Sequence, residues 1–150
     1  GTLYGVPLEV LTEDINEFRL WHGTDAATAK IIASQGFDER VAREGLYGAG
    51  SYFTDAICKA DQYSKRLPNR EGERCILYCR VIMGFSWNTP RPYHGRRPPE
   101  MQECGKDPPP HDSIYAQGGV ANHGNQHHNE YVVFNGHQVY PEYIIWYKIP

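Results

Sequence analysis

The residues best suited to chemistry lie in three segments that are far apart in the chain. His22 precedes Gly23 near the start, Tyr52 and Tyr63 follow a glycine-rich run, and Glu130 opens an apolar segment near the end. Aromatic faces attract flat cations, and a fixed carboxylate stabilises positive charge that develops beside it during a reaction. These residue types could therefore bind a flat cation and stabilise positive charge that develops during a reaction.

Each of these side chains also has a purely structural explanation. His22 could be hydrogen bonded at a strand end, Tyr52 and Tyr63 could be core aromatics, and Glu130 could be an exposed charge at a strand edge. It is their joint presence that favours a functional site.

Other sites receive less support from the sequence. The run Gly48–Gly50 lacks the third glycine of a dinucleotide-binding turn, and no phosphate-binding loop motif occurs. One short segment contains three histidines, His123, His127 and His128. No acid or cysteine at suitable spacing completes a metal site with them. The basic pair 96–97 indicates a solvated face, with contact to a polyanion as the alternative. We expect no bound metal.

Composition indicates one ordinary folded domain. The chain has 150 residues, 40% of them hydrophobic and 22% charged, with a formal net charge of −3. This charge provides no general attraction to nucleic acid or to anionic lipid. No apolar run is long enough to cross a membrane, and the sequence does not open with the charged segment and apolar run that are typical of a signal peptide. The start at Gly1 indicates an excised domain or a processed product.

The first half of the chain predicts two helices between strands. Residues 9–17 are acidic and indicate a solvated lead-in, and residues 37–50 indicate a loop. The expected elements are a strand over 19–24, a helix over 25–33 ended by Gly36, a helix after Thr54, and a central strand over 74–83.

The second half predicts a long irregular excursion followed by strands. Most prolines lie in residues 84–112, and residues 130–134 indicate a strand. Asn135-Gly136 predicts a hairpin turn into a strand over 139–147 that is bent near Pro141. The fold class is therefore α+β, with a mostly antiparallel sheet and early helices.

Three segments together resemble the catalytic domain of poly(ADP-ribose) polymerases and their diphtheria-toxin-like ADP-ribosyltransferase relatives. They are Leu20–Thr24, Tyr47–Phe53 followed by Lys59 and Tyr63, and Asn129–Phe134 followed by Gln138–Ile145. The resemblance covers residues 18–149. The run Gly36–Arg40 and the last segment look most like the tankyrase branch, whose zinc-binding cysteines and histidine have no counterpart here. It implies the ADP-ribosyltransferase fold, in which two small, mostly antiparallel sheets form a cleft for NAD.

The resemblance also implies NAD+ as co-substrate and a catalytic triad of His22, Tyr52 and Glu130. His22 and Thr24 would contact the ribose on the adenosine side. Glu130 would contact the 2′-hydroxyl of the nicotinamide ribose, and in the family this glutamate also helps to activate the acceptor.

The same resemblance implies how nicotinamide is bound. The backbone of Gly23 would hold its carboxamide through two hydrogen bonds, and Tyr52 and Tyr63 would enclose its ring. The remaining candidates for cofactor binding by resemblance are Tyr47, Phe53, Lys59 and Ala60.

Ala60 departs from the family pattern, which commonly has serine there as a hydrogen-bond partner of the carboxamide. One missing hydrogen bond corresponds to about 1 kcal/mol. We therefore expect benzamide-type inhibitors to bind more weakly than in relatives with serine, and Ala60→Ser to improve their binding.

The activity implied is NAD-dependent transfer of ADP-ribose to a macromolecular acceptor, with release of nicotinamide. Single transfer and chain extension both stay open, because polymerases of the family use a glutamate at the position of Glu130 whereas toxin-type relatives keep it and add single units. The alternatives are a weakly catalytic module that binds NAD or ADP-ribose, which only Ala60 favours, and an NAD glycohydrolase with water as acceptor.

The organisation expected from the resemblance is a single catalytic domain over residues 1–150. The family's helical regulatory domain is missing from this sequence, so the cleft should be open to NAD. The acceptor, whether protein or nucleic acid, is not identified by the sequence. We expect a monomer that can modify itself and makes no membrane contact, and that works inside a cell, either its own or that of a host.

Overall fold

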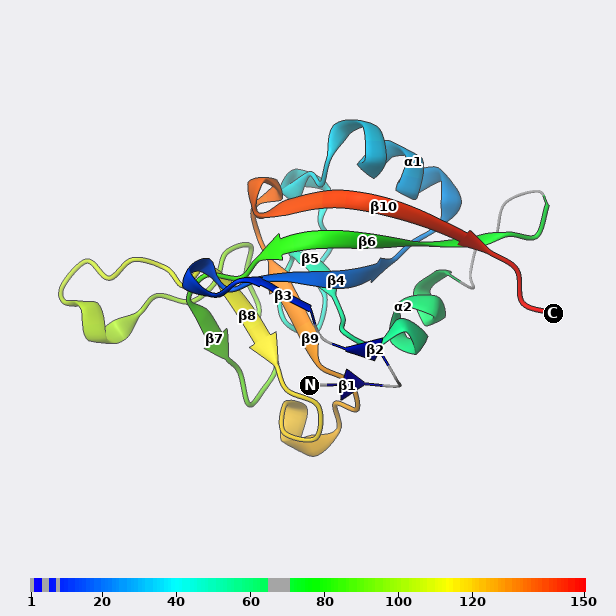
Figure 1. Cartoon of the computed structure of the whole chain (residues 1–150). Helices are drawn as coiled ribbons and strands as arrows, with labels where there is room; N and C mark the ends of the chain where they lie inside the picture. The colour runs from blue at the N-terminus through cyan, green and yellow to red at the C-terminus, as the bar shows by residue number, and fades with distance from the viewer. Residues whose placement is uncertain (1, 4–5, 8, 65–70) are drawn as a thin grey trace.

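The structure, a computed structural model, describes residues 2–3, 6–7, 9–64 and 71–150 and consists mainly of two four-stranded sheets (Figure 1). The first sheet has the order β10 (Val139–Tyr147), β6 (Arg74–Ile82), β4 (Glu17–Gly23) and β3 (Glu9–Thr12). The second has the order β5 (Ser51–Phe53), β9 (Glu130–Val133), β8 (Ser113–Ala116) and β7 (Ser86–Asn88). Within these sheets only β7 and β8 run parallel, so the predicted α+β class with mostly antiparallel sheets is confirmed.

The other described elements are short. Two α-helices, α1 (Ala26–Gln35) and α2 (Ile57–Ser64), follow β4 and β5 respectively. A two-stranded ribbon is formed by β1 (Thr2–Leu3) and β2 (Val6–Pro7). Five single turns of 3₁₀ helix complete the set: η1 (Glu13–Ile15), η2 (Glu39–Val41), η3 (Gln102–Cys104), η4 (Asn122–Gly124) and η5 (Gly136–Gln138). Neither α-helix has the length and apolar character needed to cross a lipid bilayer.

Both helices begin as local sequence signals predict. The Asp25 side chain accepts a hydrogen bond from the backbone N–H of Thr28 and caps α1, and Gly36, at φ +79°, ends it. The Thr54 hydroxyl accepts from the N–H of Ala56, so it caps the turn that leads into α2. The two helices thus start directly after the strands that carry His22 and Tyr52.

The main hydrophobic core lies between the two sheets. Leu20 and Leu77, on β4 and β6, are fully buried against Phe53 and Val133 of the second sheet. Ile32 of α1 joins the same cluster. Because side chains alternate along a strand, His22 lies on the same face of β4 as Leu20 and is directed toward the second sheet.

Two expectations about the first sheet have different outcomes. The strand over 74–83 is central, as predicted, because β6 pairs with β4 on one side and β10 on the other. The solvated lead-in over residues 9–17 is wrong. Residues 9–12 form β3, and Glu17 is buried at the start of β4, where it accepts hydrogen bonds from Arg80.

The predicted hairpin at Asn135-Gly136 is also wrong. The strands on either side, β9 and β10, belong to different sheets and do not pair. The Asn135 side chain instead accepts from the N–H of His137 and caps η5, which carries the chain from one sheet to the other. The predicted irregularity near Pro141 is confirmed, since the register of β10 against β6 shifts between Pro141 and Tyr143.

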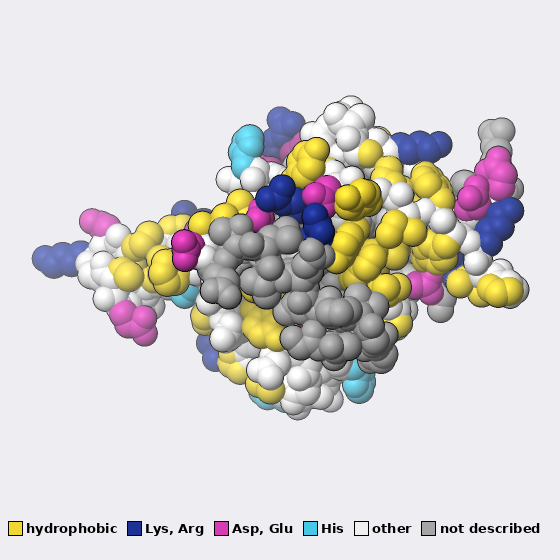
Figure 2. Space-filling model, viewed as in Figure 1, with side chains coloured by type: hydrophobic (Ala, Val, Ile, Leu, Met, Phe, Trp, Pro, Cys, Tyr) yellow, Lys and Arg dark blue, Asp and Glu magenta, His cyan; other side chains and the backbone are white. Residues whose placement is uncertain are grey.

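The outer face of the first sheet is divided between apolar and charged side chains (Figure 2). Hydrophobic side chains gather there over β6 and β10. Tyr143 and Ile145 of β10 are exposed. Beside them the guanidinium of Arg19 contacts the carboxylate of Glu142 at 2.9 Å. The excursion around η3 projects from the body of the molecule, to the left in Figure 1.

Candidate active site

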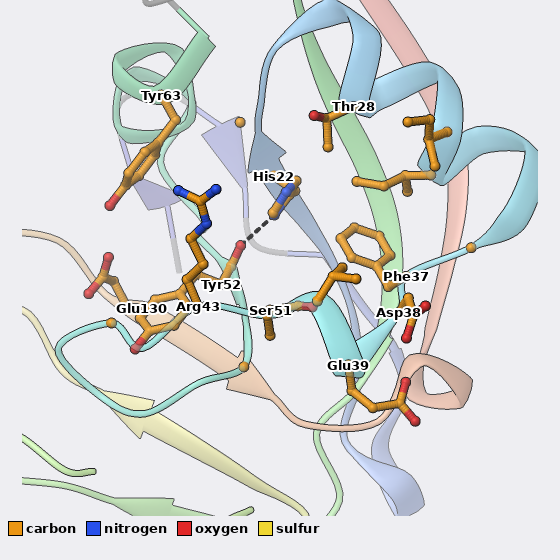
Figure 3. A pocket seen from close by; sticks show the side chains of 18 of the residues that line it. His22, Thr28, Phe37, Asp38, Glu39, Arg43, Ser51, Tyr52, Tyr63 and Glu130 are labelled. Carbon is orange, nitrogen blue, oxygen red and sulfur yellow. Dashed lines mark hydrogen bonds between the residues drawn. The ribbon is translucent and has the colours of Figure 1, made fainter. Parts of the chain in front are cut away.

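A cavity of about 1060 Å³ lies between β4, β5, α1, α2 and the loop that joins α1 to β5 (Figure 3). This volume is at the upper end of the range for small-molecule sites. Six of the candidate residues from the sequence line it: His22, Gly23, Tyr52, Lys59, Tyr63 and Glu130. Residues that lie more than one hundred positions apart in the chain thus share one cavity.

The His22 ring is fixed by contacts across the two sheets. Its Nδ1 atom is 2.7 Å from the backbone oxygen of Tyr52. The neighbouring backbone is held too, because Trp21 and Thr54 exchange two hydrogen bonds of 2.8 and 2.9 Å. The ring of Phe37 meets the imidazole edge-on at a centroid distance of 5.0 Å. Burial lowers the pKa of His22 below its ordinary value of 6.5, so the ring is neutral at pH 7.

Two tyrosines reach the cavity from different elements. Tyr52 is on β5, and its hydroxyl donates to the oxygen of Gly48 at 2.8 Å and accepts from the N–H of Tyr47 at 2.7 Å. Tyr63 is on α2 and is half-exposed, with the Lys59 ammonium 5.5 Å from its ring centroid. One ring is therefore held rigidly by the loop, while the other can adjust.

Gly23 permits a close approach between β4 and α2. A Cβ atom at this position would lie 1.9 Å from the backbone oxygen of Ala60 and 3.0 Å from the Cβ of Tyr63. A larger residue would displace α2 and with it the side chains of Lys59 and Tyr63. The glycine is thus required by packing.

Glu130 is a buried carboxylate at the start of β9, and its side chain faces the cavity (Figure 3). Burial raises its pKa above the ordinary value of 4.5, while Lys59 and a hydrogen bond from Gln126 lower it. The residues before and after Glu130 are both bound by Asp55, which accepts from the Asn129 amide at 3.0 Å and from the Tyr131 hydroxyl at 2.7 Å. The backbone that carries the carboxylate is therefore fixed on both sides.

Four candidates from the sequence are not part of the cavity lining: Thr24, Tyr47, Phe53 and Ala60. Tyr47 is fully buried, and its hydroxyl donates to Gln126 at 3.2 Å. Phe53 belongs to the main core, with its ring 5.3 Å from that of His22. Thr24 receives a contact from the thiol of Cys75 on its backbone oxygen.

Ala60 is buried with Trp21 and Ile76. A serine hydroxyl at position 60 would have to turn away from this cluster to reach the cavity. The effect of Ala60→Ser on inhibitor binding stays a prediction.

Three residues that contribute to the site were missed in the sequence. In the sequence, Asp55 is typical of an acidic residue at the start of a helix. Nothing in that pattern indicates its bonds to Asn129 and Tyr131. Gln126 lies in a polar loop without any recognisable pattern, and Arg43 lies in a loop without periodicity, although both line the cavity. Only the folded chain shows these contributions.

The described part of the chain contains no group of three or more histidines, cysteines or acids arranged to hold a metal ion. His128 instead lies beside Cys58, with 4.0 Å between its Nε2 and the sulfur.

The comparison with protein families decides the assignment. Residues 9–149 match the model of the poly(ADP-ribose) polymerase catalytic domain, so the match begins with β3 and includes almost every described element. The chain belongs to this family. Its fold is the ADP-ribosyltransferase fold of the poly(ADP-ribose) polymerases, a family of NAD-dependent transferases.

Named members of the poly(ADP-ribose) polymerase family are similar to the chain over most of its length. It is 30% identical over 146 residues to human protein mono-ADP-ribosyltransferase PARP14, covering 91% of the chain and 7% of that protein. It is 32% identical over 140 residues to mouse protein mono-ADP-ribosyltransferase PARP12, covering 91% and 17%. It is 28% identical over 171 residues to the tankyrase poly(ADP-ribose) polymerase of Caenorhabditis elegans, covering 93% and 7%. The chain therefore spans less than a fifth of each of these relatives.

Proposed function

We propose that this domain transfers ADP-ribose from NAD to a macromolecular acceptor, with His22, Tyr52 and Glu130 as the central residues of its site. The observation that carries the proposal is the buried carboxylate of Glu130, which shares one cavity with two tyrosine rings and a neutral histidine. A cationic nicotinamide ring fits between Tyr52 and Tyr63, because aromatic faces attract flat cations. The backbone of Gly23, at the edge of this space, is available to its carboxamide.

The reaction places each residue in a defined role. The bond between C1 of the ribose and the ring nitrogen breaks, and its electron pair leaves with nicotinamide. Positive charge then develops on the ribose, where Glu130 stabilises it as it forms. The acceptor atom forms the new bond to C1 and loses its proton to the Glu130 carboxylate or to solvent. The neutral His22 accepts a hydrogen bond from a hydroxyl of the other ribose.

The names of the relatives do not agree on the length of the product. Two are called mono-ADP-ribosyltransferases and one is called a poly(ADP-ribose) polymerase. We propose transfer as the activity and leave the length of the product to measurement. A hydroxyl of a bound ADP-ribose and a side chain of a protein are both acceptors that a carboxylate base can serve.

Labelled NAD tests the proposal directly. The wild-type domain should acquire covalent label and release nicotinamide, and Glu130→Gln should lower kcat by about 10² to 10³, because one preorganised charge is removed. Circular dichroism should show the same fold in both proteins. Release of nicotinamide without covalent label would show that water is the acceptor, and absence of both would refute the proposal. Mass spectrometry of the labelled protein would distinguish single units from chains and identify self-modification.

A further inference from the structure

One cation of the cavity differs from the others in its surroundings. Three arginine and lysine side chains line the cavity. Arg40 donates to both carboxylate oxygens of Asp38, at 3.0 and 2.9 Å, and Lys59 lies over the ring of Tyr63. Within the described ranges, no hydrogen bond, ion pair or ring contact engages the side chain of Arg43.

The Arg43 side chain nevertheless points into the cavity. It extends from the loop between η2 and β5, and its guanidinium is directed toward the space bordered by His22, Tyr63 and Glu130 (Figure 3). An exposed arginine has many conformations in which its charge is fully hydrated. Its inward direction therefore needs a cause in the backbone that carries it.

The backbone on both sides of Arg43 is fixed by the segment 94–96. On one side, the Arg96 guanidinium donates to the carbonyl oxygen of Ala42 at 3.1 and 3.3 Å. On the other side, the Glu44 carboxylate accepts from the N–H of Gly95 at 3.2 Å and lies 3.3 Å from His94 Nδ1. Both neighbours of Arg43 are thus held from outside the cavity, while its own side chain stays available for a ligand.

The chemistry of NAD identifies the group that such a cation suits. NAD joins its two ribose units through a diphosphate, which carries negative charge and has several acceptor oxygens. In the proposed function, nicotinamide lies between Tyr52 and Tyr63 and the other ribose lies near His22, so the diphosphate must cross the space between them. A guanidinium is a planar fork that binds phosphate oxygens through two parallel hydrogen bonds.

We propose that Arg43 binds the diphosphate of NAD and thereby positions the co-substrate; this inference rests on the proposed function. The guanidinium has no protein partner in the described chain to give up, so the contact forms without breaking an existing ion pair. Arg43 moves toward the diphosphate as nicotinamide occupies the space between the tyrosines.

Three ligands separate this role from other effects of the side chain. They are NAD, ADP-ribose, which keeps the diphosphate but lacks nicotinamide, and a benzamide-type inhibitor, which has no phosphate. Arg43→Gln should raise the KM for NAD and the Kd for ADP-ribose about tenfold or more, the size of a lost hydrogen bond to a charged group. The kcat and the inhibitor Kd should stay within about threefold. Arg43→Lys should recover part of the loss, because it keeps the charge but not the fork.

Arg97→Gln provides the matched control. It removes the same charge from an arginine outside the cavity lining, whose only ion pair in the described chain is a distant one of 4.0 Å to Glu100. Its KM for NAD should stay within about twofold of wild type, which shows that net charge alone does not produce the effect.

Equal affinity of wild type and Arg43→Gln for ADP-ribose would overturn the inference. Tighter inhibitor binding by the variant, with no change for ADP-ribose, would also overturn it and show that Arg43 occupies the nicotinamide space instead. Calorimetry measures ADP-ribose binding without turnover, so the two proposals fail separately. A wild-type protein that binds ADP-ribose but does not transfer it contradicts only the proposed function.

Discussion

The Nδ1 atom of His22 lies 2.7 Å from the backbone carbonyl oxygen of Tyr52. A carbonyl oxygen only accepts hydrogen bonds, so Nδ1 carries the proton and the neutral ring presents Nε2 as an acceptor. Because burial lowers the pKa of His22, this form persists at neutral pH. The strand that contains Tyr52 thereby determines which hydrogen bond the histidine can offer to a ribose hydroxyl.

We predict that acid weakens NAD binding through His22. The protonated ring has no acceptor at Nε2, so the KM for NAD should rise as the pH falls through the lowered pKa of His22, below 6.5. The free energy of unfolding should also decrease as the pH falls below 6.5, because the unfolded chain then binds a proton that the folded chain does not. Steady-state kinetics and denaturant unfolding over this pH range measure the two changes, and imidazole ¹⁵N NMR, with His22→Asn for assignment, reports the tautomer and the titration of the ring. A neutral tautomer with its proton on Nε2 would contradict this account.

Lys59 should set the acid limit of the reaction. Burial raises the pKa of Glu130, and the nearby ammonium of Lys59 opposes this shift. Lys59→Met should therefore raise the pKa of Glu130 further and move the acid limb of the kcat profile to higher pH, since the carboxylate must be ionised. Lys30→Met is the control, because Lys30 lies over Trp146 and outside the cavity lining. An unchanged acid limb in Lys59→Met would contradict the prediction.

Much of the fold follows from local sequence, and the reasons are visible at individual residues. Asp25 and Gly36 bound α1 because capping depends only on neighbouring backbone groups. The two apolar rows of residues 74–82 predict a central strand, and β6 is indeed paired with a strand on each of its edges. The Asn135-Gly136 signal fails because it reports a turn but not the partner of the next strand, which is β6 rather than β9.

The candidate site could be predicted only for residues that lie in the three segments resembling the family. His22, Tyr52 and Glu130 occur in recognisable runs, and the structure places them around one cavity. The direction of Arg43 depends on contacts with residues 94–96, which are about fifty positions away, and no local pattern encodes such a contact. Asp55 likewise acts through residues of β9 that the sequence does not connect to it.

The Tyr52 hydroxyl should stabilise the loop beside the cavity independently of the ring. Tyr52→Phe keeps the aromatic face but removes the bonds to Gly48 and to the N–H of Tyr47. We expect the free energy of unfolding to fall by about 1–3 kcal/mol, because the buried N–H of Tyr47 loses its partner, whereas the Gly48 oxygen still accepts from the N–H of Gly45. The KM for NAD should rise a few-fold while kcat changes less. Both values come from denaturant unfolding and steady-state kinetics.

Tyr93→Phe is the control for this loss of a hydroxyl. The Tyr93 hydroxyl donates to the oxygen of Arg97 at 2.7 Å in an exposed segment, where water can replace it. Its free energy of unfolding should therefore change by less than that of Tyr52→Phe. Equal losses in the two variants would show that the Tyr52 bonds have no special role in the loop.

Asp55 should act as a positioning residue for Glu130. Its Oδ2 atom accepts from Asn129 at 3.0 Å and from the Tyr131 hydroxyl at 2.7 Å, so one buried carboxylate holds both neighbours of Glu130. Asp55→Ala leaves both donors without this partner and should lower the free energy of unfolding by about 1–3 kcal/mol.

If Asp55 had a purely structural role, this loss of stability would be the only effect of Asp55→Ala. If Asp55 positions the catalytic carboxylate, kcat should fall at least about tenfold at a temperature where the variant is fully folded, with a smaller change in the KM for NAD, because misplacement affects mainly the transition state. Tyr131→Phe removes one of the two bonds and should give an intermediate loss of kcat. Full kcat in a folded but destabilised Asp55→Ala protein would limit Asp55 to holding β9 against the start of α2.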